Sequence, residues 1–216
     1  MSVYDSYTRA RDATLLGYWL RGNAMGDFNR GKFKELVVYL CAAAEQAGDE
    51  GFGMVKLNKL LYRADFEAYR LLGHAITGEA YEKQEFGPVA RDLPIVLDEL
   101  AAAGRLRWQS IPRGPQTRKV PTMIDDPYAA ADMSAFPPDE REVIEMARRE
   151  LAGHGGKSAS EWSHEESAGW NMAPEYGHVI DYATAFVSTK PIPPEDLERA
   201  RQFVRDRGWV PGASLS

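Results

Sequence analysis

Hydrophobic residues recur at helical spacing through one uninterrupted stretch, Val55–Leu72, and this stretch predicts the central helix of the fold. Its apolar residues fall three and four positions apart, so they share one face of an α-helix. They are Leu57, Leu60, Leu61, Ala64, Ala68, Leu71 and Leu72. Gly73 follows, as expected of a glycine just beyond a helix C-terminus. We therefore expect Leu60, Leu61 and Ala64 to be buried.

A second stripe on the same stretch carries polar and aromatic side chains. Asn58, Tyr62, Asp65 and Tyr69 are spaced by four, three and four residues, so they lie on a face next to the apolar one. Because buried polar groups need hydrogen-bond partners, we predict that Tyr62 and Asp65 bond to the helix that carries His164. The alternative is a catalytic acid–base pair of Asp65 and His164, if the fold brings the two together.

Shorter periodic stretches predict helices on both sides of this one. In chain order, they are expected at residues 11–20, 32–46, 89–103, 139–151 and 195–207. A further helix is expected to begin at Ser158, because Ser158 and Glu161 have the spacing of a capping box. These elements predict a mainly α-helical fold, in the form of a compact helical domain.

One small β-hairpin is expected between the helices. Leu106, Trp108 and Ser110 alternate with charged or polar residues, and a Pro-Arg-Gly-Pro turn at residues 112–115 separates them from residues 119–121. A helix followed by a hairpin has winged-helix-like features, which are typical of some DNA-binding proteins. The predicted fold class is therefore mainly α with a small β-hairpin.

Two prolines bear on where the helix at residues 89–103 begins. Gly87-Pro88 is a turn pattern, and Pro88 is expected at the first helical position, where its missing N–H is not needed. Pro94 lies inside the same predicted helix, so we expect a kink or a delayed start there.

The pattern divides the chain into three parts. Residues 1–31 are expected to form an N-terminal extension, residues 32–190 the helical domain, and residues 191–216 a C-terminal helix and tail. Glycines between Gly26 and Gly31 and prolines between Pro191 and Pro194 mark the two boundaries.

Composition places the chain among globular proteins. Of its 216 residues, 44% are hydrophobic and 27% are charged, and no apolar run approaches the roughly 20 residues that a membrane span needs. The N-terminus lacks the apolar core of a signal peptide, and the single Cys41 cannot form an internal disulfide. We expect a cytoplasmic protein that has no membrane contact.

Charge is distributed unevenly. The formal net charge is −6, which argues against direct nucleic-acid binding over a broad surface. Arg105, Arg107, Arg113, Arg118 and Lys119 nevertheless follow one another without an intervening acid. A local basic feature on an acidic body suits a protein partner, because charge complementarity sets encounter rate and partner choice.

Gly155-Gly-Lys-Ser158 resembles the end of a phosphate-binding loop. That pattern also needs a glycine at position 151, which is a leucine, and it needs a preceding strand, where a helix is expected. We therefore interpret these residues as a loop that leads into a helix, and we expect no cofactor.

Metal and catalytic sites are weakly supported. Glu161/His164 and Glu175/His178 have the spacing found in di-metal helical bundles, but further glutamate ligands on other helices are not marked. Cys41 lies on an apolar helix face, and no Gly-x-Ser-x-Gly elbow occurs. We expect no metal site and no catalytic residue, and hence no enzyme.

Several short motifs follow one another along the chain. They are Lys56-Leu57-Asn58-Lys59-Leu60-Leu61-Tyr62, Ala64-Asp65, Tyr81, Gly87-Pro88-Val89, Ser163-His164 and Trp170. In this order and spacing, residues 32 to 172 resemble the Panacea domain of SocA-like antitoxins. The resemblance implies that the motif residues are structural determinants of the scaffold, and it brings no catalytic activity.

The resemblance also implies a function. The chain would be the antitoxin of a toxin–antitoxin system and would neutralise a cognate protein toxin by direct binding, with a role as proteolytic adaptor for a toxin as an alternative. A winged-helix-like nucleic-acid-binding regulator is the next alternative, and a hydrolase or metal enzyme is the third. Salt-dependent retention on DNA would favour the regulator, and a stoichiometric metal would favour the enzyme.

The surface that meets the toxin is predicted from charge and exposure. We expect it to combine the basic hairpin with exposed parts of the segment from Tyr81 to Gly87. The predicted contact residues are Tyr81, Phe86, Arg105, Arg107, Arg113 and Arg118.

Overall fold

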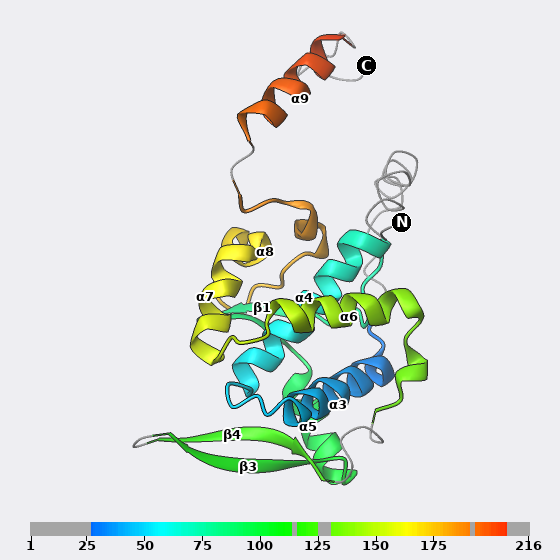
Figure 1. Ribbon diagram of the computed structural model, residues 1–216, viewed down its shortest axis with the longest axis vertical. Helices are drawn as coiled ribbons and strands as arrows, with labels where there is room; N and C mark the ends of the chain where they lie inside the picture. Colours follow the sequence, from blue (N-terminus) through cyan, green and yellow to red (C-terminus); the bar gives the residue numbers. More distant parts are fainter. Residues whose placement is uncertain (1–26, 114–115, 125–130, 191–192, 207–216) are drawn as a thin grey trace.

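The computed structural model describes residues 27–113, 116–124, 131–190 and 193–206 (Figure 1). Its α-helices are α3 (Arg30–Gln46), α4 (Met54–Leu72), α5 (Leu93–Ala102), α6 (Pro138–Glu150), α7 (Gly156–Glu166), α8 (Ala168–Met172) and α9 (Pro194–Asp206). Its strands are β1 (Tyr81–Gln84), β2 (Gly87–Ala90), β3 (Leu106–Arg113) and β4 (Gln116–Met123). Two short 3-10 helices are η1 (Met133–Ala135) and η2 (Tyr182–Phe186). The mainly helical class is confirmed.

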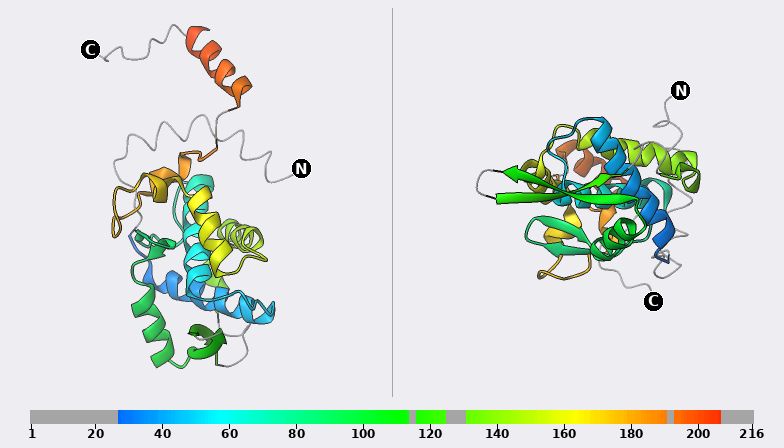
Figure 2. Two further views of the ribbon diagram at one scale, coloured as in Figure 1. Left: turned by 90° about the vertical axis from the view of Figure 1, so that its left-hand side faces the viewer. Right: turned by 90° about the horizontal axis from the view of Figure 1, so that it is seen from below.

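Helix α4 is the centre of the fold. It contacts α3, α6, α7, β2 and η2, and Figure 2 shows it between the β1–β2 hairpin on one side and α6 and α7 on the other. Twelve of its 19 residues are buried. Leu60, Leu61 and Ala64 are 5%, 0% and 1% exposed, which confirms the prediction. The helix ends at Gly73, whose φ of 81° is the left-handed conformation that glycine adopts readily.

The strands form two separate antiparallel hairpins, where the sequence predicted one. β3 pairs with β4 in the expected place, and Figures 1 and 2 show these strands running out past the helical body. The second hairpin, β1–β2, pairs Tyr81 with Ala90 and Gln84 with Gly87. Strands of four residues have no room for a clear alternation of apolar and polar positions, so the pattern did not reveal them.

The predicted helix start at Pro88 is wrong. Pro88 lies in β2 opposite Lys83, and the N–H of Ala90 donates to the Asn58 side chain at 2.8 Å. These tertiary partners satisfy the backbone in an extended conformation. Helix α5 begins at Leu93 with Pro94 in its first turn, which confirms the delayed start.

The capping box predicted at Ser158 is also wrong in detail. Helix α7 begins at Gly156, so Ser158 is its third residue and not its N-cap. The Ser158 hydroxyl accepts a hydrogen bond from the N–H of Gly155 at 3.0 Å. Helices α3, α4, α6 and α9 lie within two residues of their predicted bounds, whereas the short helix α8 was not predicted. The helix predicted at residues 11–20 falls outside the described residues.

Winged-helix-like features are not confirmed. The apolar face of α5 is buried in the core, including Leu93 and Val96, so it is not free to enter a groove. Two nearby acids are engaged as well, since Arg30 lies 3.2 Å from Asp92 at the N-cap of α5 and 2.7 Å from Glu99 on α5.

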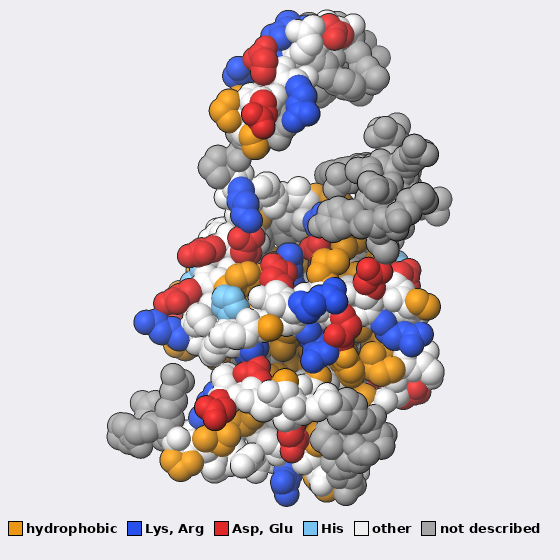
Figure 3. All heavy atoms as spheres, viewed as in Figure 1, with side chains coloured by type: hydrophobic (Ala, Val, Ile, Leu, Met, Phe, Trp, Pro, Cys, Tyr) orange, Lys and Arg blue, Asp and Glu red, His pale blue; other side chains and the backbone are white. Residues whose placement is uncertain are grey.

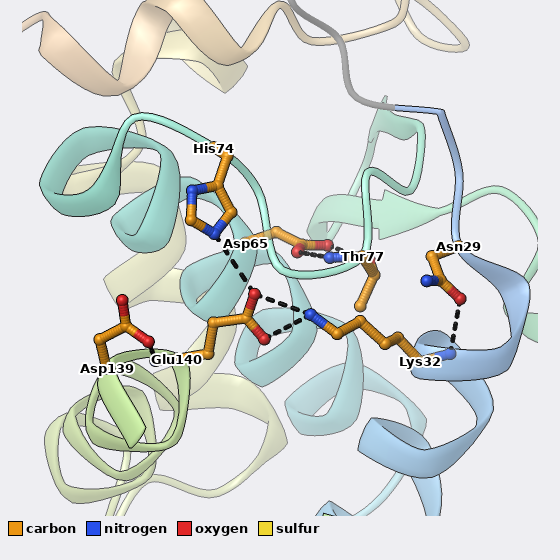
Figure 4. Close-up of polar contacts among 7 residues, drawn as sticks. All are labelled: Asn29, Lys32, Asp65, His74, Thr77, Asp139 and Glu140. Carbon is orange, nitrogen blue, oxygen red and sulfur yellow. Dashed lines mark hydrogen bonds and ion pairs between the residues drawn. The ribbon is translucent and has the colours of Figure 1, made fainter. Parts of the chain in front are cut away.

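A buried ionic cluster joins α3 and α6 to the segment after α4 (Figure 4). Glu140, which is 2% exposed, accepts from Lys32 Nζ at 2.7 and 2.5 Å and lies 3.3 Å from His74 Nε2. A buried carboxylate is tolerated only where it is paired, so the cluster fixes the position of α6 against α3 and the C-terminal end of α4.

Candidate functional site

The turn of the β1–β2 hairpin, residues 84–88, is held by side chains that come from three helices. The indole Nε1 of Trp170, on α8, donates to the Gln84 carbonyl at 2.9 Å. The Ser160 hydroxyl, on α7, donates to the Phe86 carbonyl at 3.1 Å. These two bonds tie the turn to α7 and α8.

The third helix contributes Lys59, which lies on α4 and is 1% exposed. Its ammonium donates to the Pro88 carbonyl at 2.8 Å, and burial lowers the pKa of Lys59 to about 7. Gly87 has φ of +96°, and a Cβ there would lie 2.2 Å from Ser163 Oγ and 2.7 Å from Lys59 Cε. Only glycine therefore fits between these two side chains. We call Lys59, Ser160, Ser163 and Trp170 the turn clamp.

The ring of Trp170 is packed against two further side chains. His164 stacks on it with ring centroids 4.0 Å apart and planes at 13°. Lys83 Nζ lies 4.7 Å from the ring centroid and donates to the Ala173 carbonyl at 2.8 Å. Burial, together with the nearby charge of Lys59, lowers the pKa of His164. The motif residues Lys59, Ser163, His164 and Trp170 thus converge on one turn.

Asp65 is fully buried beside this hairpin. Its carboxylate accepts from the Thr77 N–H at 2.7 Å, the Thr77 hydroxyl at 2.5 Å and the Tyr81 hydroxyl at 2.8 Å (Figure 4 shows the Thr77 contact). The prediction that its partners lie on the helix of His164 is therefore wrong. Those three bonds engage the carboxylate, so the acid–base pair is not supported either. The sequence could not place Thr77, because it lies in a segment without a periodic pattern.

The predicted partner of Tyr62 is displaced by one residue from the helix that carries His164. The Tyr62 hydroxyl lies 2.7 Å from Ser167 Oγ, and Ser167 is the C-cap of α7 and the N-cap of α8. The Ser167 hydroxyl also accepts from the Trp170 N–H at 3.0 Å. Tyr62 therefore helps to orient the helix that carries Trp170.

Glu79 is a buried carboxylate that sequence reasoning missed. It is 1% exposed, and burial raises its pKa to about 7. Oε1 accepts from the Asp92 N–H at 3.2 Å, whereas Oε2 is buried without a hydrogen-bond partner in the described part of the chain. No periodic pattern marked this position, so only the tertiary structure reveals its burial.

Replacing Glu79 with glutamine is expected to flatten the dependence of stability on pH. A carboxyl with a raised pKa binds more protons in the folded state, so its contribution is complete below the ordinary value of 4.5 and is lost as pH rises to about 7. The uncharged Glu79→Gln variant should avoid this loss and exceed the parent at pH 8 by on the order of 1–3 kcal/mol.

Urea unfolding near pH 5 and pH 8 measures this difference. Glu142→Gln, at an exposed position on α6, is the control and should leave the pH dependence unchanged. An equal loss of stability between the two pH values in the parent and in Glu79→Gln would show that Glu79 is not the responsible group.

The predicted contact residues divide into exposed and buried ones. Phe86 is 59% exposed at the turn that the clamp holds. Tyr81 is 0% exposed, so the prediction that it contacts a partner is wrong. Its aromatic ring packs instead against Tyr62 and Phe66.

Two of the predicted arginines attach the β3–β4 hairpin to the body. Arg105 pairs with Glu35 of α3 at 2.6 Å. Arg118 donates to the carbonyls of Gly51 and Glu50 at 3.3 and 2.7 Å. Charge spacing alone could not show these internal partners. That Arg105 contacts a partner stays a prediction.

The other two arginines lie on the same hairpin. Arg107 is exposed on β3, and Arg113 is the last residue of that strand. In the register of the two strands, Arg107 lies opposite Thr122 and Arg113 opposite Gln116 on β4.

Phe86 and Arg118, which are far apart in sequence, line one pocket of about 440 Å³. Its wall is formed by the first turns of α4 and α7, by β4 and by the β1–β2 turn. Met54, Lys119 and Lys157 are among the other lining residues. The structure therefore brings part of the basic hairpin next to the clamped turn.

Neither a metal-binding cluster nor a membrane-spanning helix is present in the described ranges. No three His, Cys, Asp or Glu side chains there come together in a group that could hold a metal ion. None of the described helices has the length and apolar character that crossing a membrane requires.

A comparison with protein families gives a match. The model of a family described as "Antitoxin SocA-like, Panacea domain" matches residues 57–171, more than half of the chain. The matched segment contains the whole turn clamp and both hairpins, and it leaves α3 and α9 outside. Comparisons with curated proteins and with solved structures find no match.

Proposed function

The chain belongs to the Panacea domain family of SocA-like antitoxins, and we propose that it neutralises a cognate toxin by direct protein contact. One observation carries the choice of surface. The turn clamp fixes residues 84–88 by three hydrogen bonds, from Lys59, Ser160 and Trp170, while Phe86 at that turn stays 59% exposed. A fixed backbone that presents an exposed aromatic side chain is suited to anchoring a protein partner.

The charge around Phe86 supports a protein partner. Arg118 and Lys119 of β4 line the same pocket as Phe86, and Arg107 is exposed farther along the hairpin. Exposed charges beside an apolar anchor affect the encounter rate and the choice of partner.

The surface gives less support to a nucleic-acid partner. On the face seen in Figure 3, acidic and basic side chains are intermingled over the body and no broad basic surface gathers. Duplex affinity comes from many clustered cations, and the net charge of the whole chain is −6. Retention on DNA that weakens with salt would favour the regulator over the antitoxin.

The clamp also supports a role without catalysis. Lys59 and Ser163 are the pair whose residue types would suit a nucleophile and its base, and they are 1% and 0% exposed. A substrate could not reach them without opening the hairpin. In the proposed function they position the turn.

Co-expression with the protein encoded by the neighbouring gene tests the proposal. That protein alone should arrest growth, and this chain should restore growth and form a stoichiometric complex with it. Phe86→Ala should weaken the complex by about tenfold to a hundredfold, because an aromatic anchor contributes roughly 2 kcal/mol or more.

Phe186→Ala is the matched control, since Phe186 on η2 is 48% exposed and lies outside the pocket. It should bind the toxin as the parent does. Restored growth without a complex would point to the proteolytic adaptor or another indirect mechanism. Equal weakening by the two substitutions would move the interface away from the turn.

A further inference from the structure

The pocket beside Phe86 lies where two helix N-termini converge. The loop before α4 and the loop before α7 touch at Gly51 and Gly155, and a Cβ on Gly51 would lie 2.9 Å from the Gly155 Cα. Gly53 and Gly155 are the N-cap residues, so neither supplies a capping side chain. The first N–H groups of both helices therefore carry partial positive charge at one wall of the pocket.

Side chains add full positive charges to the same pocket. Lys56, Arg118, Lys119 and Lys157 line it, against one acidic lining residue, Glu161. The Lys157–Glu161 contact is 3.8 Å long and both side chains are largely exposed, so it neutralises little.

Two of these cations are held in place by the protein itself. Lys56 is 3% exposed and pairs with Asp49 at 2.6 Å, and Arg118 is bonded to the loop carbonyls of Glu50 and Gly51. Lys119 and Lys157 are exposed at the rim. Because Asp49 offsets the charge of Lys56, a ligand would meet the fixed Arg118 guanidinium with two adaptable cations, Lys119 and Lys157, beside it.

The rest of the pocket is apolar. Phe86 and Met54 line it, with three glycines that leave backbone accessible. A volume of about 440 Å³ is suited to one or two side chains of a peptide. This combination fits a carboxylate with an apolar neighbour better than a phosphate backbone, which carries charge at every repeat and needs a long basic surface.

We propose that this pocket binds an acidic peptide segment of the partner, with a carboxylate at the two helix N-termini and an apolar side chain against Phe86. The inference rests on the proposed function for the identity of the partner, which is the cognate toxin. It adds the chemical class of the group that the antitoxin recognises.

A short synthetic peptide tests the pocket without the toxin. The probe is the acetylated, amidated peptide Glu-Phe-Glu-Phe-Glu, added to the full-length ¹⁵N-labelled chain and followed by amide chemical shifts. Gly51, Gly53 and Gly156 report on the pocket, and their signals should shift with a response that weakens as salt rises. Gly73 and Gly104, at the ends of α4 and α5, should not move.

Charge reversal at the rim identifies the responsible cations. Lys119→Glu together with Lys157→Glu should weaken peptide binding by at least about tenfold, because both lysines are exposed and the fold does not depend on them. Arg141→Glu with Arg201→Glu changes the net charge equally at exposed positions outside the pocket and should bind as the parent does. The peptide Lys-Phe-Lys-Phe-Lys should cause no shift at the three reporter glycines.

Different results would overturn the peptide-binding proposal and the proposed antitoxin function. Absence of shifts at the reporter glycines, in a chain that still restores growth, overturns the pocket and leaves the antitoxin proposal standing. Peptide binding in a chain that does not neutralise its neighbour overturns the antitoxin proposal. A single-stranded oligonucleotide that shifts the same glycines at lower concentration than the peptide overturns the peptide assignment in favour of a nucleic acid.

Discussion

Replacing Leu61 with alanine is expected to lower the free energy of unfolding by about 2–5 kcal/mol. Leu61 is 0% exposed on α4, the helix that contacts α3, α6 and α7, so the removed methyl groups leave a cavity among three partners that cannot all move inward. Urea denaturation of the purified variant measures the change.

Ile95→Ala is the control for this experiment. Ile95 is 53% exposed on α5, so its truncation should change stability by less than about 0.5 kcal/mol. A loss below about 1 kcal/mol at Leu61 would show that the α4 stripe is not the main core of the domain.

Gly87→Ala is expected to lower the free energy of unfolding by about 2–5 kcal/mol, in two parts. The φ of +96° is strained for any residue with a Cβ, and the added methyl would overlap Ser163 Oγ at 2.2 Å and Lys59 Cε at 2.7 Å. Urea unfolding gives the stability loss, and loss of toxin binding should accompany it because the turn presents Phe86.

Ser163→Ala separates the two parts. It removes the oxygen that the new methyl group would meet, so the double variant Gly87→Ala/Ser163→Ala should be more stable than the sum of the single changes predicts. Additive losses would contradict a direct overlap between these two positions and would leave backbone strain and the overlap with Lys59 as the causes.

The parts of the fold that the sequence predicted are those determined locally. Apolar residues recur three and four positions apart along the whole of helix α4, so its bounds and its buried face could be predicted from this spacing alone. The β3–β4 hairpin was predictable because its strands of eight residues flank a turn sequence.

The candidate site depends on contacts between segments that are distant along the chain. Each clamp bond joins the turn to a helix that precedes it by about 30 residues or follows it by more than 70, so no local pattern encodes the bond. The motif residues could be listed, but their common target could not be identified.

At Gly155–Ser158 the local structure could be predicted in part, but its neighbour in space could not. Its interpretation as a loop that ends in a capping box is only partly right, since α7 already begins at Gly156 and only Gly155 precedes the helix. That a second helix N-terminus lies beside it could not be predicted, because the close approach of Gly51 and Gly155 joins loops about 100 residues apart. The boundaries expected at residues 32 and 190 stay a prediction.

The long sequence separation within the turn clamp has a consequence for synthesis on the ribosome. The Gln84 carbonyl can accept its bond from the indole only after Trp170, which lies 86 residues farther along the chain, has been translated. At roughly 5–20 residues per second, the nascent hairpin remains without this partner for about 4 to 17 s, plus the time that residue 170 needs to leave the exit tunnel. A chain interrupted before Trp170 would lack this bond, and one interrupted before Ser160 would keep only the Lys59 bond to the turn. The newly made protein therefore completes its turn only after residue 170 has been translated.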